Sequence, residues 1–164
     1  MDDEQASNVA VLALGLRGLK DTSHFDMSWY CTLHNVRQQD GIPNGIRKHY
    51  AACGSSCCAL GHGPVFGVKI PQGTLDWESY SRTTMDLTYE KSESRWFFAF
   101  SSEHPSDPVA AAHRLVWLMM NRDSKRPPAA VDGYPVDDED NRLPEPDWEL
   151  VRKIAGRDPL PCPT

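Results

Sequence analysis

The sequence lacks any long hydrophobic run and any basic leader segment. Its 164 residues contain no stretch of about 18 consecutive apolar residues, the minimum for a membrane-spanning helix. The chain begins with Met1-Asp2-Asp3-Glu4, whereas a secretory signal begins with basic residues followed by an apolar segment. These absences predict a cytoplasmic protein with no membrane partner.

Cysteine is scarce, and its number is odd. A secreted disulfide scaffold usually has an even number of cysteines and more cysteine per residue. We therefore expect reduced thiols, in keeping with a cytoplasmic protein. The five cysteines are Cys31, Cys53, Cys57, Cys58 and Cys162.

An excess of basic residues is also missing. The chain has 17 basic and 23 acidic residues, which gives a net charge of −6. Residues 132–149 contain eight acidic residues and a single base, Arg142, so this segment carries −7 and the remainder about +1. Without a basic excess, the composition argues against direct binding of nucleic acid.

The strongest helical signal covers residues 106–121, where apolar residues recur at helical spacing. We expect Ser106 to cap this helix and Asp107-Pro108 to occupy its first turn, where proline is tolerated and a negative charge meets the helix dipole favourably. The expected buried stripe consists of Val109, Ala112, Leu115, Val116, Met119 and Met120.

Similar patterns predict four more helices. The first covers residues 6–20, although Gly15 and Gly18 weaken it because glycine has a low helix propensity. A short helix over 57–62 is expected to stop at Gly63-Pro64. The remaining two predicted helices cover residues 76–85 and 147–155.

We therefore expect a mainly α fold, a compact helical domain with long irregular loops and room for one short strand pair. The aromatic segment 95–100 is too short for periodicity to separate a strand from a buried helical turn. Residues 124–146 are rich in Pro, Gly and Asp, which predicts extended chain. In this organisation residues 1–130 form the helical domain, and residues 131–164 form an acidic, Pro-rich extension with one short helix.

A set of motifs in region 6–121 carries a family resemblance. Residues 53–61 read Cys-Gly-Ser-Ser-Cys-Cys-Ala-Leu-Gly, and matching positions elsewhere are Phe25-Asp26-Met27, Trp29, Trp77, Tyr80, Trp96-Phe97-Phe98, Asp107-Pro108 and Arg114-Leu115. The region resembles a family of small phage and bacterial proteins whose signature is Cys-Gly-Thr/Ser, two residues, Cys, two residues and Gly. The resemblance implies a mainly helical fold and a phage or mobile-element setting, and it implies no particular reaction.

The cysteine cluster and His62 allow three interpretations. Free cysteines are most often small buried residues, and this structural role, which needs no cofactor, is the leading interpretation. Alternatively, a thiolate at a helix N-terminus is reactive, so Cys57 or Cys58 could act as the nucleophile of a cysteine hydrolase or redox protein, with His62 as base. A zinc-stabilised module would instead use Cys53, Cys57, His62 and His34, although a second paired cysteine motif is missing.

The acidic run over residues 137–140 is the second candidate site. It lacks the spaced ligands and central glycine of a calcium-binding loop, so it is either a solvated loop or a surface that mimics nucleic acid. Closely placed carboxylates suit a basic groove that normally binds nucleic acid. Trp117 is interpreted either as a core residue or as an exposed anchor at an interface.

Charge placement and family resemblance together predict a phage-type accessory protein that is not an enzyme. Its expected partner is a host protein, of the kind that binds nucleic acid, which the acidic surface would inhibit as a counter-defence factor. Formation of a homodimer stays open. The predicted contact residues are Asp137, Asp138, Glu139, Asp140 and Trp117.

Overall fold

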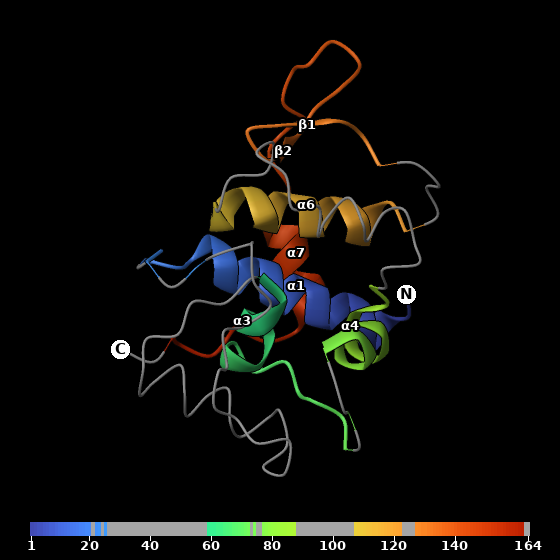
Figure 1. The fold of residues 1–164 in the computed structure, drawn as a ribbon, viewed down its shortest axis with the longest axis vertical. Coiled ribbons are helices and arrows are strands. Elements are labelled where there is room, and N and C mark those ends of the chain that lie inside the picture. Colours follow the sequence, from blue (N-terminus) through green and yellow to red (C-terminus); the bar gives the residue numbers. More distant parts are fainter. Residues whose placement is uncertain are drawn as a thin grey trace.

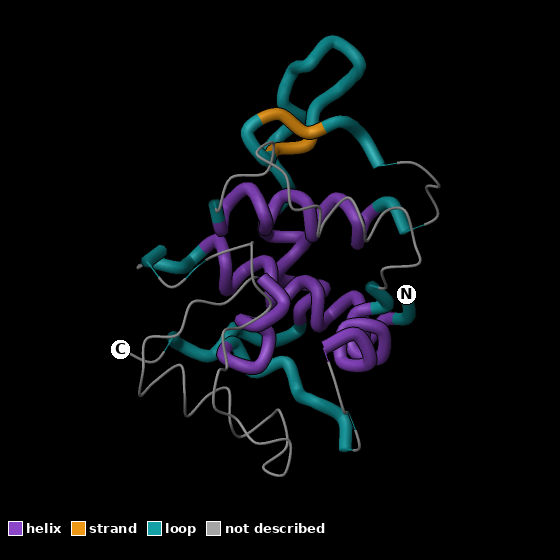
Figure 2. The backbone as a smooth tube through the Cα atoms, in the orientation of Figure 1, coloured by secondary structure: helices purple, strands orange, loops and turns teal. Residues whose placement is uncertain are grey.

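The computed structural model describes residues 1–20, 22–23, 25, 59–72, 74, 77–87, 107–122 and 127–162. Helices dominate these residues, and one short antiparallel strand pair accompanies them, so the predicted mainly α fold is confirmed (Figure 2). The elements are α1 (Asp3–Arg17), α3 (Ala59–Val65), α4 (Trp77–Met85), α6 (Pro108–Met120), β1 (Ala130–Val131), β2 (Tyr134–Pro135) and α7 (Trp148–Ala155).

Helix α1 lies at the centre of the fold and contacts each of the other four described helices (Figure 1). Figure 1 shows α6 on one side of α1 and the shorter α3 and α4 on the other. Residues from Asn8 to Leu16 are all buried, because neighbours cover α1 on every side rather than along a single stripe. Every helix in the described ranges is too short or too polar to traverse a bilayer.

Helix α1 begins three residues earlier than its apolar pattern predicts. Asp2 is its N-cap and accepts a hydrogen bond from the backbone N–H of Gln5, whose side chain accepts one from the backbone N–H of Asp2. This reciprocal capping box satisfies two backbone donors, so the polar first turn is helical although it contributes little to the core.

Helix α6 differs from expectation in its cap and in its buried face. Asp107 is the N-cap, because its carboxylate accepts hydrogen bonds from the N–H groups of Val109 and Ala110; the predicted cap, Ser106, lies outside the described residues. The expected buried stripe is wrong at Met120, which is 50% exposed, and at Val109, which is half-buried. Instead, His113 and Arg114 are buried, and β2 packs against α6.

Helix α3 continues through Gly63-Pro64, where the sequence predicted its end, and finishes at Val65. Proline normally disfavours helical backbone in the residue before it, through contact with that residue's Cβ, and Gly63 has none. The stop is at Gly67, whose φ of +91° lies in the left-handed region. Hydrogen bonds from Gly67 N to Pro64 O and from Val68 N to Gly63 O complete a Schellman motif there.

The strand pair lies in residues 130–135, within the segment predicted to be extended. Ala130 pairs with Pro135, and Val131 pairs with Tyr134. The two-residue turn, Asp132-Gly133, has positive φ at both positions, which is the geometry that matches the twist of a hairpin. The segment 95–100, whose sequence is compatible with a strand or a buried helical turn, lies outside the described residues.

Residues after 131 share the core of the helices. Helix α7 begins one residue after the predicted start, because Asp147 is its N-cap, and the left-handed Gly156 follows its last residue. Its Val151 and Ala155 are buried in the cluster that contains α1. Ser7 Oγ donates a hydrogen bond to Ala155 O over 2.7 Å, which holds α7 against α1.

Candidate functional site

The structure describes only one member of the predicted cysteine site. His62 lies in α3 with 0% exposure, its ring centroid 5.6 Å from that of Phe25 and 5.7 Å from that of Phe66. The other proposed members, Cys53, Cys57, Cys58 and His34, lie outside the described residues. Within the described part of the chain, no three potential metal ligands come together.

The acidic run forms an ordered loop at the open end of the hairpin. A bridge between Val136 and Arg142 closes it, and the loop extends away from the helices (Figure 1). Inside the loop, Asp137 Oδ1 accepts hydrogen bonds from the backbone N–H groups of Glu139 and Asn141, each over 2.9 Å. The pKa of Asp137 is lowered, first by the Asn141 N–H and then by that of Glu139, since both stabilise the charged carboxylate. Asp137 is therefore the structural centre of the loop.

Asp138 and Asp140 have a different role in this loop. Both are exposed, and among the described residues neither carboxylate makes a hydrogen bond or ion pair. Asp140 has a φ of +61°, a conformation that Asp and Asn tolerate better than most residues. The hydrogen bonds of Asp137 thus fix the backbone while Asp138 and Asp140 present unpaired charge to solvent.

Trp117 lies beside these carboxylates, although 20 or more residues separate it from them in the sequence. It lines a groove of about 690 Å³ together with Asp137, Asp138, Asp140 and residues 127–129. Trp117 is half-buried, so it belongs neither wholly to the core nor wholly to the surface. Of the five predicted contact residues, the structure brings four together in one groove, and Glu139 is exposed on the same loop.

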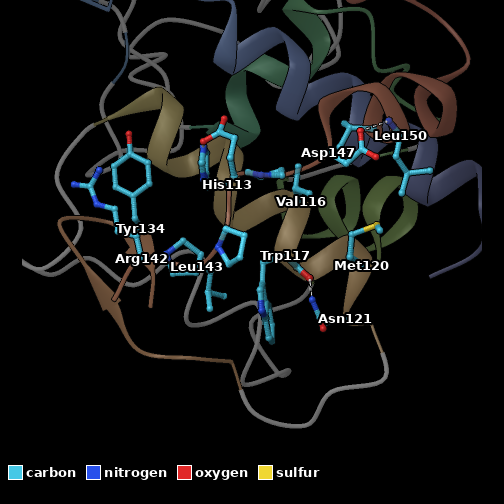
Figure 3. Close-up of a pocket in the computed structure, with 15 residues that line it drawn as sticks. His113, Val116, Trp117, Met120, Asn121, Tyr134, Arg142, Leu143, Asp147 and Leu150 are labelled. Atoms are coloured by element: carbon cyan, nitrogen blue, oxygen red, sulfur yellow. Dashed lines mark hydrogen bonds and ion pairs between the residues drawn. The ribbon is translucent and has the colours of Figure 1, made fainter. Parts of the chain in front are cut away.

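A second pocket, of about 550 Å³, lies between α6, α7 and the segment that joins the hairpin to α7 (Figure 3). Trp117 also lines this pocket, so the two hollows adjoin. Apolar lining comes from α6, α7 and the joining segment, and polar lining comes mainly from the joining segment. Prominent members are Val116, Met120, Leu143, Leu150, Val151, His113, Arg142, Glu145 and Asp147.

His113 lies at one end of the second pocket, between two aromatic rings. Its ring meets Tyr134 edge-on at 5.0 Å and Trp148 at 5.6 Å, and its Nε2 is 3.5 Å from Glu145 Oε2. An arginine lies over each of these two aromatic rings. The guanidinium carbon of Arg142 is 4.1 Å from the Tyr134 ring centroid, and that of Arg17 is 4.6 Å from the Trp148 ring centroid. Trp148 Nε1 also donates to Glu145 Oε1 over 2.6 Å, so Glu145 links helix α7 to His113.

Arg114 holds the hairpin against α6. It is completely buried, and its Nη1 donates a hydrogen bond to the carbonyl of Gly133, in the hairpin turn. Burial lowers the pKa of Arg114 to about 10, while Asp107 acts in the opposite direction. Tyr134 adds a hydrogen bond from its hydroxyl to Asp107 Oδ2 over 3.2 Å. These contacts set the position of the acidic loop relative to Trp117.

Sequence reasoning identified Trp117 and the acidic run but missed the cluster around His113. Its members come from α6, β2 and the residues before α7, and helical periodicity cannot relate positions so far apart. A signal for the hairpin was present in Asp132-Gly133, because Asp-Gly is a preferred hairpin turn, but this signal does not indicate that the hairpin packs on α6.

The comparisons with known proteins give no match: no family model, curated protein or solved structure is similar to this chain. The resemblance to the phage and bacterial family therefore stays a prediction.

Proposed function

We propose that this chain is a protein-binding accessory factor without enzymatic activity, which presents its acidic loop to a basic surface of another protein. The observation that supports this most is the groove in which Trp117 meets Asp137, Asp138 and Asp140. A half-buried tryptophan next to exposed carboxylates has the composition of a binding surface, since aromatic anchors supply contact area and charge supplies orientation.

The order of the loop supports the same function. Two backbone hydrogen bonds to Asp137 hold the segment in one conformation before any partner arrives. A preorganised surface loses less conformational entropy on binding than a flexible one. Closely placed carboxylates at fixed positions suit a groove whose lysine and arginine side chains normally contact the phosphates of a nucleic acid. The proposed partner is therefore a nucleic-acid-binding protein.

The family resemblance supplies the setting of the proposal. A phage or mobile-element protein of this kind acts in the host cytoplasm on a host protein. When it occupies a basic groove it excludes nucleic acid from that groove, which makes the accessory factor an inhibitor and suits a counter-defence role.

Affinity capture from a bacterial lysate tests the proposal when it is combined with competition. Immobilised wild-type chain should retain a protein that a duplex DNA oligonucleotide releases. The combined variant Asp138→Asn, Asp140→Asn should lose that protein, because it removes two exposed charges and leaves Asp137, the centre of the loop, intact.

A matched control separates charge from surface change in general. Leu160→Ser alters a side chain that is 40% exposed and lines neither hollow, so it should retain the partner fully. Equal capture by the wild type and the neutralised variant, or capture that DNA does not compete with, would contradict the proposal.

A further inference from the structure

The pocket between α6 and α7 has an unusual share of exposed apolar side chains. Only four large apolar residues of the described chain are exposed: Met120 (50%), Val131 (42%), Leu160 (40%) and Leu150 (36%). Two of these, Met120 and Leu150, line this pocket, and the buried Val116 and Val151 line it as well. An exposed apolar cluster rimmed by polar groups is typical of a surface that contacts another molecule.

This pocket adjoins the acidic groove. Trp117 lines both hollows, with the carboxylates of the loop on one side and the apolar pocket on the other. Trp117, Met120 and Asn121 lie at the C-terminal end of α6 (Figure 3). A partner segment bound along the loop would therefore reach the apolar pocket without leaving the surface.

Charges around the two hollows favour a cationic occupant. Asp137, Asp138 and Asp140 line the groove, and Glu145 and Asp147 line the pocket, against one base, Arg142. The last turn of α6 contains no basic residue, so the negative end of its dipole is not offset within the helix. A second copy of this chain would bring acidic face against acidic face, which like-charge repulsion opposes.

We propose that the pocket between α6 and α7 receives one large apolar side chain of a short basic segment of the partner, which anchors that segment while its cations face the acidic groove. This inference rests on the proposed function, and it adds the sequence character of the contacted segment. A volume of about 550 Å³ holds such a side chain together with the neighbouring backbone of the segment, and buried apolar anchors of this kind dominate many interfaces.

Two matched peptides test this inference. The probes are the acetylated and amidated pentapeptides Lys-Lys-Leu-Lys-Lys and Lys-Lys-Ser-Lys-Lys, titrated at low ionic strength into the ¹⁵N-labelled chain and followed by NMR chemical shifts. The leucine peptide should bind about tenfold more tightly, because it buries one additional apolar side chain. Its additional shifts should centre on the amides of Val116, Met120 and Leu150.

Variants locate the anchor site. In the double variant Met120→Ser, Leu150→Ser the leucine peptide should bind no more tightly than the serine peptide, whereas Leu160→Ser should preserve the tenfold difference. Met120 and Leu150 are exposed, so their replacement spares the core. The variant Asp138→Asn, Asp140→Asn should weaken both peptides to a similar extent.

Several outcomes would overturn the inference. If both peptides bind equally and the variant Asp138→Asn, Asp140→Asn weakens both, the pocket does not hold an apolar anchor. The proposed function would not be contradicted by that result. If neither peptide binds, the inference of an apolar anchor is wrong as well. The proposed function is then tested separately, by the capture experiment with DNA as competitor. A dimer in sedimentation velocity that Met120→Ser, Leu150→Ser dissociates would identify a second copy as the occupant instead.

Discussion

Gly15 shows why a residue that weakens a helix in isolation is needed in this one. It lies in the last turn of α1, and a Cβ atom built at this position would overlap the side-chain ring of Phe66. Sequence alone indicates only the helix propensity that glycine sacrifices, roughly 1 kcal/mol relative to alanine. The structure shows what the glycine allows: Phe66, the residue that follows α3, packs directly against the backbone of α1.

The variant Gly15→Ala should therefore destabilise the protein by about 1–3 kcal/mol, the usual cost of overpacking. Urea denaturation monitored by circular dichroism measures the loss. Gly18→Ala is the matched control, because it lies at the end of the same helix with a φ of −86° and its Cβ would come no closer than 3.4 Å to a neighbouring atom. If both variants have the wild-type midpoint, the contact with Phe66 does not determine the choice of glycine.

His113 is a second residue whose environment predicts a measurable property. Burial lowers its pKa below the ordinary 6.5, Arg17 and Arg142 act in the same direction, and Glu145 and Asp107 oppose them. The unfolded chain therefore binds a proton more readily than the folded chain. The stability that neutral His113 contributes is complete above pH 6.5, and it is lost as the pH falls through the lowered pKa.

An NMR titration of the His113 ring protons should accordingly have its midpoint below 6.5. Glu145→Gln should move the midpoint further down, because it removes the nearest opposing charge, whereas Arg17→Gln should move it up. A midpoint above 6.5, or shifts of the same sign in both variants, would show that burial does not dominate at this site.

At the scale of elements, the acidic loop depends on one side chain. Asp137→Ala removes the acceptor of the Glu139 and Asn141 N–H groups, so these two amides should exchange with solvent at least about tenfold faster. Native-state hydrogen exchange by NMR measures this change. Asp138→Ala should leave both exchange rates unchanged, and Asp137→Asn should retain most of the protection, because its amide oxygen is still an acceptor. Equal protection in Asp137→Ala would contradict this role.

The elements that sequence predicted best are those whose signals are local. The helix predicted over 147–155 agrees with α7 to within one residue, because its limits are set locally by the N-cap Asp147 and the left-handed Gly156. Helix α3 was predicted less well, because its end depends on a glycine preceding Pro64 and on the left-handed Gly67. The exposure of Met120 could not be predicted from α6 alone, since it depends on which segments cover that helix.

The candidate site was predictable in its parts and not in its assembly. The acidic run and Trp117 are recognisable by composition and residue type. Their meeting in one groove depends on the hairpin, and Arg114 places that hairpin by donating from the core to Gly133. A buried arginine that hydrogen-bonds the backbone of a distant turn leaves no periodic signal in the sequence.

At the scale of the whole molecule, the C-terminal residues are held to the central helix by several independent contacts. Ser7 donates to the carbonyl of Ala155, and Arg157 Nη2 donates to Asn8 Oδ1 over 2.9 Å. Leu160 N donates to Phe66 O over 3.0 Å, which ties the end of the described chain to the residue after α3. Acidic loop, pocket and core are thereby joined through α7, so the binding surface and the core should share one folding transition.

The variant Val151→Ala tests this coupling. Val151 is 1% exposed and belongs to both the core and the pocket lining, so its truncation should lower the free energy of unfolding by about 2 kcal/mol. Because α7 lies in the same core as α1, tryptophan fluorescence and far-ultraviolet circular dichroism should report one shifted urea transition for both probes. Leu150→Ala, the adjacent and exposed position, should change stability by less than about 0.5 kcal/mol. Two separate transitions, with Val151→Ala moving only one of them, would mean that the C-terminal residues fold apart from the helical core.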